Sequence, residues 1–249
     1  MIKVSIVTVV KNAETTIQRT IESVLKQSYK NIEYIIIDGL SSDQTLNIIK
    51  NYGHQISVVI SEADIGIYDA MNKGVSQTTG EIVGIISAGD IFANEKIVEL
   101  IVEKFKSNSL DAVYGNVEYF SPKNINKIIR TYKSDKFKPN LIKNGIIPAH
   151  PSLFLKKIIY ENNGLYNTSY KIAGDFDFIA RIFFDGTVKY FYIPQTIVKM
   201  EYGGVSTAGL RSMLIINQEI YRSCQINGIK TSYQRLALRY FKKIIEFIN

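Results

Sequence analysis

Short runs of β-branched apolar residues alternate with segments of helical periodicity through the first ninety residues. The apolar runs predict buried strands at residues 3–10, 32–37, 56–60 and 81–86. Between them, apolar residues recur at helical spacing in residues 13–26, 43–52 and 67–76. Because strands that alternate with helices build parallel sheets with right-handed crossovers, we predict an α/β fold with a mainly parallel sheet flanked by helices.

The alternation becomes irregular in the second half of the chain. A helix is predicted at residues 94–106 and another at 176–184, with strands at 112–120, 125–132, 152–155 and 189–193. The last 45 residues predict two helices separated at Asn227 and Gly228. We expect one α/β domain over residues 1–205, divided at residues 119 and 120, and a C-terminal extension of basic amphipathic helices over residues 206–249.

The composition is that of an ordinary globular protein and excludes several classes. Of 249 residues, 46% are hydrophobic and 21% are charged, which excludes disordered and collagen-like chains. No run approaches the ~20 apolar residues that span a bilayer, and the first residues do not form a secretion signal. One cysteine, Cys224, allows no internal disulfide and supplies too few thiolates for a zinc site. We therefore expect a cytoplasmic protein.

The net charge of +7 is distributed unevenly. Residues 1–119 hold 10 Lys and Arg against 15 Asp and Glu, whereas residues 120–160 hold 9 against 1. A basic surface of this kind suits nucleic acid, anionic lipid or a phosphorylated substrate. On the last predicted helix, Arg235, Arg239, Lys242 and Lys243 share one side and apolar residues cover much of the rest. This pattern fits a helix at a membrane interface and fits equally a helix packed on the domain.

Three aspartates recur at a regular interval along the predicted sheet. Asp38, Asp64 and Asp90 are spaced 26 residues apart, and each follows a predicted strand. The carboxyl ends of parallel strands share one edge, where open α/β sheets bind ligands. Converging carboxylates are tolerated when they share cations and hydrogen-bond donors, and a nucleotide with Mg²⁺ or Mn²⁺ supplies both. The alternative for Asp38 is a simple turn with Gly39.

At these residues the chain resembles the nucleotide-sugar-dependent glycosyltransferases of family 2, which have the GT-A fold with a Rossmann-like sheet. The matching segments are SIVTVVKNAETTIQRTIESVLKQSYKNIEYIIIDGLSSDQT, SEADIGIYDAMNKGVSQTTGEIVGIISAGD, HPSLF and AGDFDFIARI. Among members of the family, the chain looks most like bacterial enzymes of exopolysaccharide, capsule or O-antigen synthesis. The resemblance implies that residues 1–119 bind the nucleotide-sugar and that residues 120–205 bind the acceptor.

The resemblance also implies roles for individual residues in the first half. Asp90 would bind the metal and diphosphate, although Ala88 stands where the first acid of the family's Asp-x-Asp motif would be. The residues expected to bind the nucleotide are Thr8 and Val10 in the base pocket, Asp38 and Asp64 on the uridine, and Asn72 and Lys73 at the same rim.

In the second half, the resemblance implies that Asp175 is the general base that deprotonates the acceptor. Gly174 replaces the acid that commonly precedes this aspartate, and a helix cap at Asp175 or a base role for Asp177 are the alternatives. His150 is a candidate contact for the acceptor or leaving group, with a structural role as the alternative. Ser206 and Arg211 are candidate phosphate contacts in a loop that would close over the diphosphate. An ordinary glycine turn is the alternative.

Together these observations predict a metal-dependent, inverting hexosyltransferase. The donor would be a nucleotide-diphosphate sugar, most simply a UDP-sugar, and the acceptor a lipid-linked saccharide at the inner face of the cell membrane, without a nucleic-acid partner. One alternative is nucleotidyl transfer, although TVVKNAETT is not the glycine-rich, Lys-bearing loop that this chemistry uses. Another is a catalytically silent nucleotide-sugar-binding subunit or sensor, which the missing acids at Ala88 and Gly174 favour.

Overall fold

The structure is a computed structural model that describes residues 1–107, 109–203, 210–237 and 239. The strands of this part of the chain are β1 (Val4–Val10), β2 (Ile32–Asp38), β3 (Val58–Ser61), β4 (Ile82–Ser87), β5 (Ile91–Phe92), β6 (Ala112–Ser121), β7 (Asn124–Tyr132), β8 (Phe154–Lys156) and β9 (Tyr190–Glu201). Its α-helices are α1 (Ile17–Leu25), α2 (Thr45–Lys50), α3 (Ile67–Gln77), α4 (Ile97–Ser107), α5 (Lys157–Asn163), α6 (Gly174–Phe183) and α7 (Leu210–Ile226). Short 3-10 helices occur at η1 (Gly53–Gln55), η2 (Pro139–Asn144) and η3 (His150–Ser152).

The strands of the described residues form one sheet in the order β3-β2-β1-β4-β8-β6-β9-β5, with β7 paired to β6. β1 is parallel to both β2 and β4, and β2 is parallel to β3. Each antiparallel pair includes a strand from the second half of the chain. For example, β8 lies between β4 and β6 and is antiparallel to both. The predicted α/β fold with a mainly parallel sheet is therefore confirmed, and the ends of β1, β2, β3 and β4 open on one edge.

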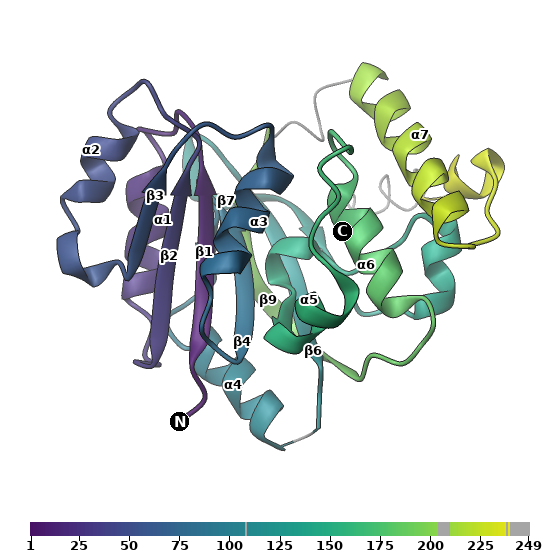
Figure 1. Ribbon diagram of the computed structural model, residues 1–249, viewed down its shortest axis with the longest axis horizontal. Coiled ribbons are helices and arrows are strands. Elements are labelled where there is room, and N and C mark those ends of the chain that lie inside the picture. The colour runs from purple at the N-terminus through teal and green to yellow at the C-terminus, as the bar shows by residue number, and fades with distance from the viewer. Residues whose placement is uncertain (108, 204–209, 238, 240–249) are drawn as a thin grey trace.

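Helices cover both faces of this sheet. On one face, Ile17, Ile21 and Val24 of α1 share a buried cluster with α4 and with alternate residues of β1 and β2. On the other face, α3, α5 and α6 pack on the intervening strand residues, with Phe178 and Phe183 fully buried. Figure 1 shows α3, α5 and α6 in succession across this second face, with α7 at the upper right. Each fully buried side chain contributes roughly 1.5–3 kcal/mol, so both helical layers hold the sheet in place.

β9 is longer than the sequence predicts. The sequence patterns predict a strand at residues 189–193, whereas β9 runs from Tyr190 to Glu201 and includes Pro194. Tyr114 of β6 pairs with Tyr192, and Asn116 pairs with Thr196, so the chain of β9 bulges around Pro194. A bulge removes the local ladder hydrogen bonds, and proline, which has no N–H to donate, is therefore accommodated there.

The C-terminal segment shares the core of the α/β fold. α7 packs against α6, and Ile220, Cys224 and Leu236 are buried in the same cluster as the α6 side chains. The chain turns after α7 at Asn227 and Gly228, as predicted, and residues 233–237 are again helical. Of the predicted basic amphipathic helix, Arg235 and Arg239 are described, and Arg239 donates to Asn217 of α7 at 2.9 Å, whereas Lys242 and Lys243 lie outside the described residues. Among the described helices, none is both long and apolar enough to cross a bilayer.

Candidate functional site

Asp38 ends β2 at the open edge of the sheet, with its carboxylate turned inward. It is 0% exposed and accepts hydrogen bonds from the Ser41 amide at 3.1 Å, the Ser41 hydroxyl and the Ser61 hydroxyl at 2.6 Å. Ser61 is the last residue of β3, so Asp38 ties the ends of two strands and the following turn together. Because these hydrogen bonds occupy the Asp38 carboxylate, it fixes the shape of the rim at this edge of the sheet.

Asp64 lies directly over the backbone of Gly39. A Cβ atom on Gly39 would sit 2.0 Å from Asp64 Oδ2 and 3.3 Å from Cδ of Lys11, so only glycine admits the aspartate here. The second oxygen, Oδ1, accepts from the Gly66 amide at 3.0 Å. Asp64 is only half-buried, unlike Asp38. The structure thus brings these two predicted residues together and leaves Asp64 as the one that faces solvent.

Asp90 closes the turn that follows β4. Its Oδ2 accepts from the Ser87 amide at 3.1 Å, and the neighbouring Gly89 amide donates to the Thr20 hydroxyl of α1 at 2.9 Å. Burial raises the pKa of the Asp90 carboxyl to about 7, against the Ser87 hydrogen bond and the positive charge of Arg19, which lower it. β1 separates β2 from β4, so the ends that carry Asp38 and Asp90 stand two strand spacings, roughly 10 Å, apart.

The residues around Asp90 fit a divalent cation that is shared with a substrate. Within the described residues, no group of three or more His, Cys, Asp or Glu side chains is placed to hold a metal. Mg²⁺ typically binds one or two carboxylates and completes its shell with substrate phosphates and water. A single buried carboxylate with a raised pKa is poorly solvated as an anion, and a cation at Asp90 would relieve that cost.

Thr8 and Val10 lie in β1 among core residues. Thr8 is 0% exposed, and its hydroxyl is 3.1 Å from the hydroxyl of Tyr34, so its side chain does not reach the open edge. Val10 is the last residue of the strand, and its carbonyl accepts from the Gly39 amide at 2.8 Å. Of the two predicted base-pocket residues, Val10 is the one positioned at the rim.

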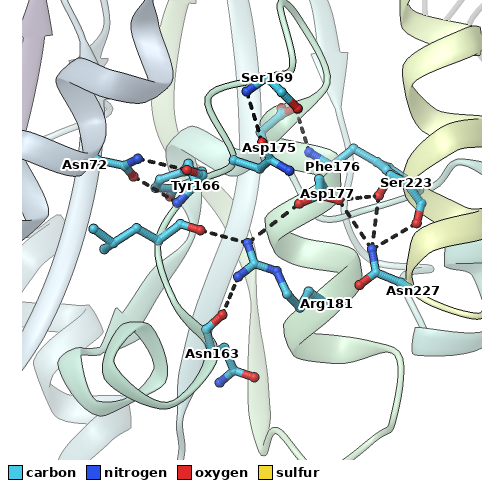
Figure 2. A network of polar contacts seen from close by, with 12 residues as sticks. Asn72, Asn163, Tyr166, Ser169, Asp175, Phe176, Asp177, Arg181, Ser223 and Asn227 are labelled. Atoms are coloured by element: carbon cyan, nitrogen blue, oxygen red, sulfur yellow. Dashed lines mark hydrogen bonds and ion pairs between the residues drawn. The ribbon is translucent and has the colours of Figure 1, made fainter.

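Asn72 and Lys73 on α3 are engaged with the protein itself. The Asn72 amide donates to the Tyr166 carbonyl and accepts from the Tyr166 amide, both at 2.8 Å (Figure 2). The Lys73 ammonium lies 2.7 Å from the Ala63 carbonyl, 2.9 Å from Glu62 and 3.2 Å from Asp69. These contacts fix the loop that carries Asp64 and the segment around Tyr166, so both residues support the rim from within, and nucleotide contact by either stays a prediction.

Asp175 begins α6 beside Tyr68 of α3. The pKa of the Asp175 carboxyl is raised to about 6, chiefly by burial and also by the negative charge of Glu219, against a hydrogen bond from the Phe176 amide, which lowers it. A carboxyl with a pKa just below neutrality is ionised at pH 7 and still a useful proton acceptor. Asp175 therefore has the electrostatic character that the general-base assignment requires.

Asp177 faces the opposite way, toward α7. Its Oδ1 accepts from the Ser223 hydroxyl at 2.8 Å and from the Asn227 amide at 3.3 Å, and its Oδ2 lies 3.6 Å from Arg181 (Figure 2). The residue is buried. These partners occupy the carboxylate and give Asp177 a structural position between the two helices, so the geometry favours Asp175 of the two predicted candidates.

His150 joins a cluster of tyrosines near Asp175. Its Nε2 is 2.8 Å from the hydroxyl of Tyr166, which in turn is 3.4 Å from that of Tyr160. Burial lowers the pKa of His150 to about 4, so the imidazole is neutral at pH 7. The ring of Tyr166 stacks on Tyr68 at a centroid distance of 6.0 Å, which connects His150 to the surroundings of Asp175.

The remaining predicted contacts lie on the C-terminal segment. Ser206 lies outside the described residues. Arg211 is exposed in the first turn of α7. Phosphate contact by Arg211 therefore stays a prediction.

Four residues near the predicted site have no signal in the sequence patterns considered above. Arg19 of α1 pairs with Glu201 and lies next to the Asp90 turn, and its Nε is buried without a hydrogen-bond partner among the described residues. Tyr68, Tyr166 and Glu219 surround Asp175 or the loop before it. Each is far in sequence from the residue that it contacts, so only tertiary structure identifies them.

The sheet order is that of the GT-A fold, as solved structures of similar fold show. A Staphylococcus aureus TarS fragment in complex with UDP-GlcNAc superimposes with a TM-score of 0.68 at 16% identity, over 90% of this chain and 70% of that one. A mannosyltransferase of Pyrobaculum calidifontis, in complex with GDP-Man and Mn²⁺, gives 0.65 at 16% identity, over 89% and 63%. This chain spans 39% of the longer TarS chain.

The chain belongs to glycosyl transferase family 2, whose family model matches residues 5–162. Among curated proteins, a PGL/p-HBAD biosynthesis glycosyltransferase of Mycobacterium tuberculosis is 26% identical over 208 residues, which cover 81% of this chain and 78% of the relative. An uncharacterized glycosyltransferase of Haemophilus influenzae is 24% identical over 220 residues, which cover 83% and 68%. The predicted family and the GT-A fold are thus confirmed, and glycosyltransferase activity is supported.

Proposed function

We propose that this protein transfers a hexose, with inversion, from a UDP-sugar to a hydroxyl of a lipid-linked saccharide. One observation carries the proposal: the start of α3 lies between two carboxylates of different character. On one side, Asp64 rests on Gly39 at the rim. On the other side, Tyr68 packs on Gly174 and donates to the Ile172 carbonyl in the loop just before Asp175. A sugar between the two would have its nucleotide toward Asp64 and its acceptor toward Asp175.

The chemistry follows from these positions. Asp175 takes the proton of the acceptor hydroxyl while the hydroxyl oxygen forms a bond to the anomeric carbon. The bond from that carbon to the diphosphate oxygen breaks on the opposite face, and the nucleoside diphosphate leaves with its electron pair. One displacement of this kind inverts the anomeric configuration. Asp90 would hold Mg²⁺ or Mn²⁺, which supplies charge neutralisation for the leaving diphosphate.

The nucleotide preference is argued from Asp64. A carboxylate accepts a hydrogen bond from the N3–H of uracil, a donor that cytosine lacks. The TarS complexes with UDP and UDP-GlcNAc support a uracil nucleotide, whereas the GDP-Man complex of the mannosyltransferase makes a guanine nucleotide the main competitor.

A membrane-bound acceptor is argued from the β6–β7 hairpin and the segment after it. The exposed residues of this region are mostly basic or apolar, namely Lys123, Ile125, Lys127, Ile128, Lys133, Lys136 and Lys138. Each lysine near an anionic lipid surface contributes about 1 kcal/mol of attraction. The excess of positive charge between residues 120 and 160 would therefore hold the protein at the inner face of the membrane, where a lipid-linked saccharide is available.

Binding and turnover together test the proposal. We expect UDP and UDP-sugars, but not CDP, to raise the melting temperature, with a larger rise in the presence of Mn²⁺. We expect Asp64→Ala to abolish that rise. Asp175→Asn should keep it and lose ~10²–10⁴-fold in transfer to a polyprenyl-diphosphate-linked saccharide. NMR of the product should show an inverted anomeric centre.

Three outcomes would contradict the proposal. A melting temperature that no nucleotide changes would contradict the proposed nucleotide site. Unchanged transfer by Asp175→Asn would contradict the general-base role of Asp175. Tight UDP binding without hydrolysis or transfer of any nucleotide-sugar would favour the alternative of a silent nucleotide-sugar-binding subunit or sensor.

A further inference from the structure

The loop before α6 is held by a single carboxylate of α7. Glu219 accepts the backbone N–H groups of three successive residues: Oε1 from Lys171 at 2.7 Å, and Oε2 from both Ile172 and Ala173 at 2.9 Å. These residues immediately precede Gly174 and Asp175. An ionised carboxylate only accepts hydrogen bonds, so it can satisfy three converging donors, which a glutamine cannot do without turning its own NH₂ toward one of them.

Tyr68 holds the same loop from the other side. Its hydroxyl lies 2.5 Å from the carbonyl of Ile172, and its ring fills the space beside Gly174. Ile172 therefore has its N–H bound by α7 and its carbonyl bound by α3. α3 and α7, which are far apart in the sequence, thus fix the same peptide segment. Asp175 follows three residues after Ile172.

From this arrangement we infer that Glu219 is a positioning residue for Asp175. Its carboxylate fixes residues 171–173 and so directs the Asp175 carboxylate at the acceptor hydroxyl. The inference rests on the proposed function, because it assumes that Asp175 acts on an acceptor. α7 thereby becomes part of the acceptor site even though none of its side chains needs to touch the substrate. A misplacement of about 1 Å at a reacting group can cost 10²-fold in rate.

The charge of Glu219 has a second effect, on the proton affinity of the base. The groups that face Asp175 are Glu219 from α7, Tyr68 from α3 and Tyr166 from the segment after α5. Burial raises the pKa of Asp175, the hydrogen bond from the Phe176 amide opposes burial, and Glu219 adds to the increase through like-charge repulsion. Removing the Glu219 charge should therefore lower the pKa of Asp175, whereas removing the Tyr68 hydroxyl, which donates to the Ile172 carbonyl, takes away a contact of the loop without removing a charge.

The experiment uses the full-length protein, a UDP-sugar and the polyprenyl-diphosphate-linked acceptor. For Glu219→Gln we expect kcat to fall 10- to 100-fold and UDP affinity to stay within twofold of the wild type. The acid limb of the pH profile should move to lower pH. Tyr68→Phe keeps the ring on Gly174 but removes the hydrogen bond to the Ile172 carbonyl, and should lower kcat without moving that limb. Glu219→Asp should recover part of the lost kcat, and Gln218→Ala, an exposed neighbour on α7, should match the wild type.

The outcomes separate this inference from the proposed function. A wild-type protein without transfer activity would end the proposed function. If the wild type is active and Asp175→Asn is not, then a Glu219→Gln protein with normal kcat and an unmoved pH limb overturns the inference alone. A Glu219→Gln protein whose activity falls only in proportion to its folded fraction, measured by circular dichroism, also overturns it. If that variant does not fold, full activity in Glu219→Asp, whose shorter side chain draws the carboxylate away from residues 171–173, overturns it.

Discussion

The ring of Tyr68 occupies the space that a side chain at residue 174 would need. A Cβ atom on Gly174 would lie 2.7 Å from Cε2 and 2.8 Å from two further ring atoms of Tyr68. The glycine at this position thus has a packing reason within the structure: any larger side chain would meet the Tyr68 ring, whose hydroxyl donates to the Ile172 carbonyl in the same loop.

Gly174→Ala tests this packing. We expect a loss of about 1–3 kcal/mol in unfolding free energy, because the methyl group overpacks against the ring. In a Tyr68→Ala background the same substitution should be neutral or stabilising by up to about 1 kcal/mol, since alanine favours helix more than glycine does. Chemical denaturation of the four proteins measures the coupling. Equal costs in both backgrounds would contradict the packing argument.

Gly39→Ala should separate nucleotide binding from folding. The new methyl group would fall 2.0 Å from Asp64 Oδ2, so Asp64, which lies at the half-exposed rim, must move away. We expect UDP affinity to drop at least tenfold, while the melting temperature changes little because the displaced group is at the surface. Calorimetry checks the affinity. In an Asp64→Ala background the substitution should cost no further affinity, and a full additional loss there would show that it acts through another group.

Asp175 and Asp177 should respond in opposite ways to replacement by asparagine. Asp177→Asn weakens the contacts to Ser223, Asn227 and Arg181 in a buried setting, and we expect a loss of about 1–3 kcal/mol in stability. Asp175→Asn removes a carboxylate whose pKa burial raises, so at pH 8 stability should stay equal or rise. Urea denaturation at pH 8 measures both. A larger loss for Asp175→Asn would reverse the structural assignment of the two residues.

The buried imidazole of His150 should make the folded protein less stable in mild acid. Burial lowers its pKa to about 4, below the ordinary value of 6.5, so the unfolded chain binds more protons between these limits. Stability from this residue is therefore complete above pH 6.5 and is lost as the pH falls toward 4, by about 1–3 kcal/mol. His150→Gln should flatten that part of the pH profile of the melting temperature. His54→Gln, at the exposed second histidine, is the matched control and should leave the profile as it is.

The sheet and the place of the carboxylates follow from local patterns. Apolar runs and helical periodicity identify β1 to β4 and their helices, and parallel strands necessarily end on one edge, where Asp38, Asp64 and Asp90 lie. The patterns do not distinguish the two faces of a strand, and Thr8 illustrates this, because its side chain is buried against Tyr34 below the rim. Likewise they end the predicted strand at residue 193, whereas β9 continues through a bulge that depends on its pairing with β6.

The surroundings of the base depend on contacts between distant residues. Tyr68 and Ile172 are 104 positions apart, and Glu219 is 48 positions from Lys171. No periodicity or motif joins such pairs, since they form only when α3, α6 and α7 pack around the same loop. Asn72 shows the same limit: its place in the family pattern indicates the nucleotide rim, while its amide is taken up by Tyr166.

The single thiol of the protein gives the α6–α7 junction an internal reporter. Cys224 on α7 is 0% exposed, and burial raises its pKa to about 11. A thiol reagent in neutral solution therefore reacts with it only when α7 separates from α6. The rate at which Cys224 is labelled therefore measures how often α7 separates from the domain in the unmodified protein. Because Glu219 is on the same helix, a bound acceptor that stabilises the loop before α6 would slow the reaction of Cys224 with a coloured thiol reagent.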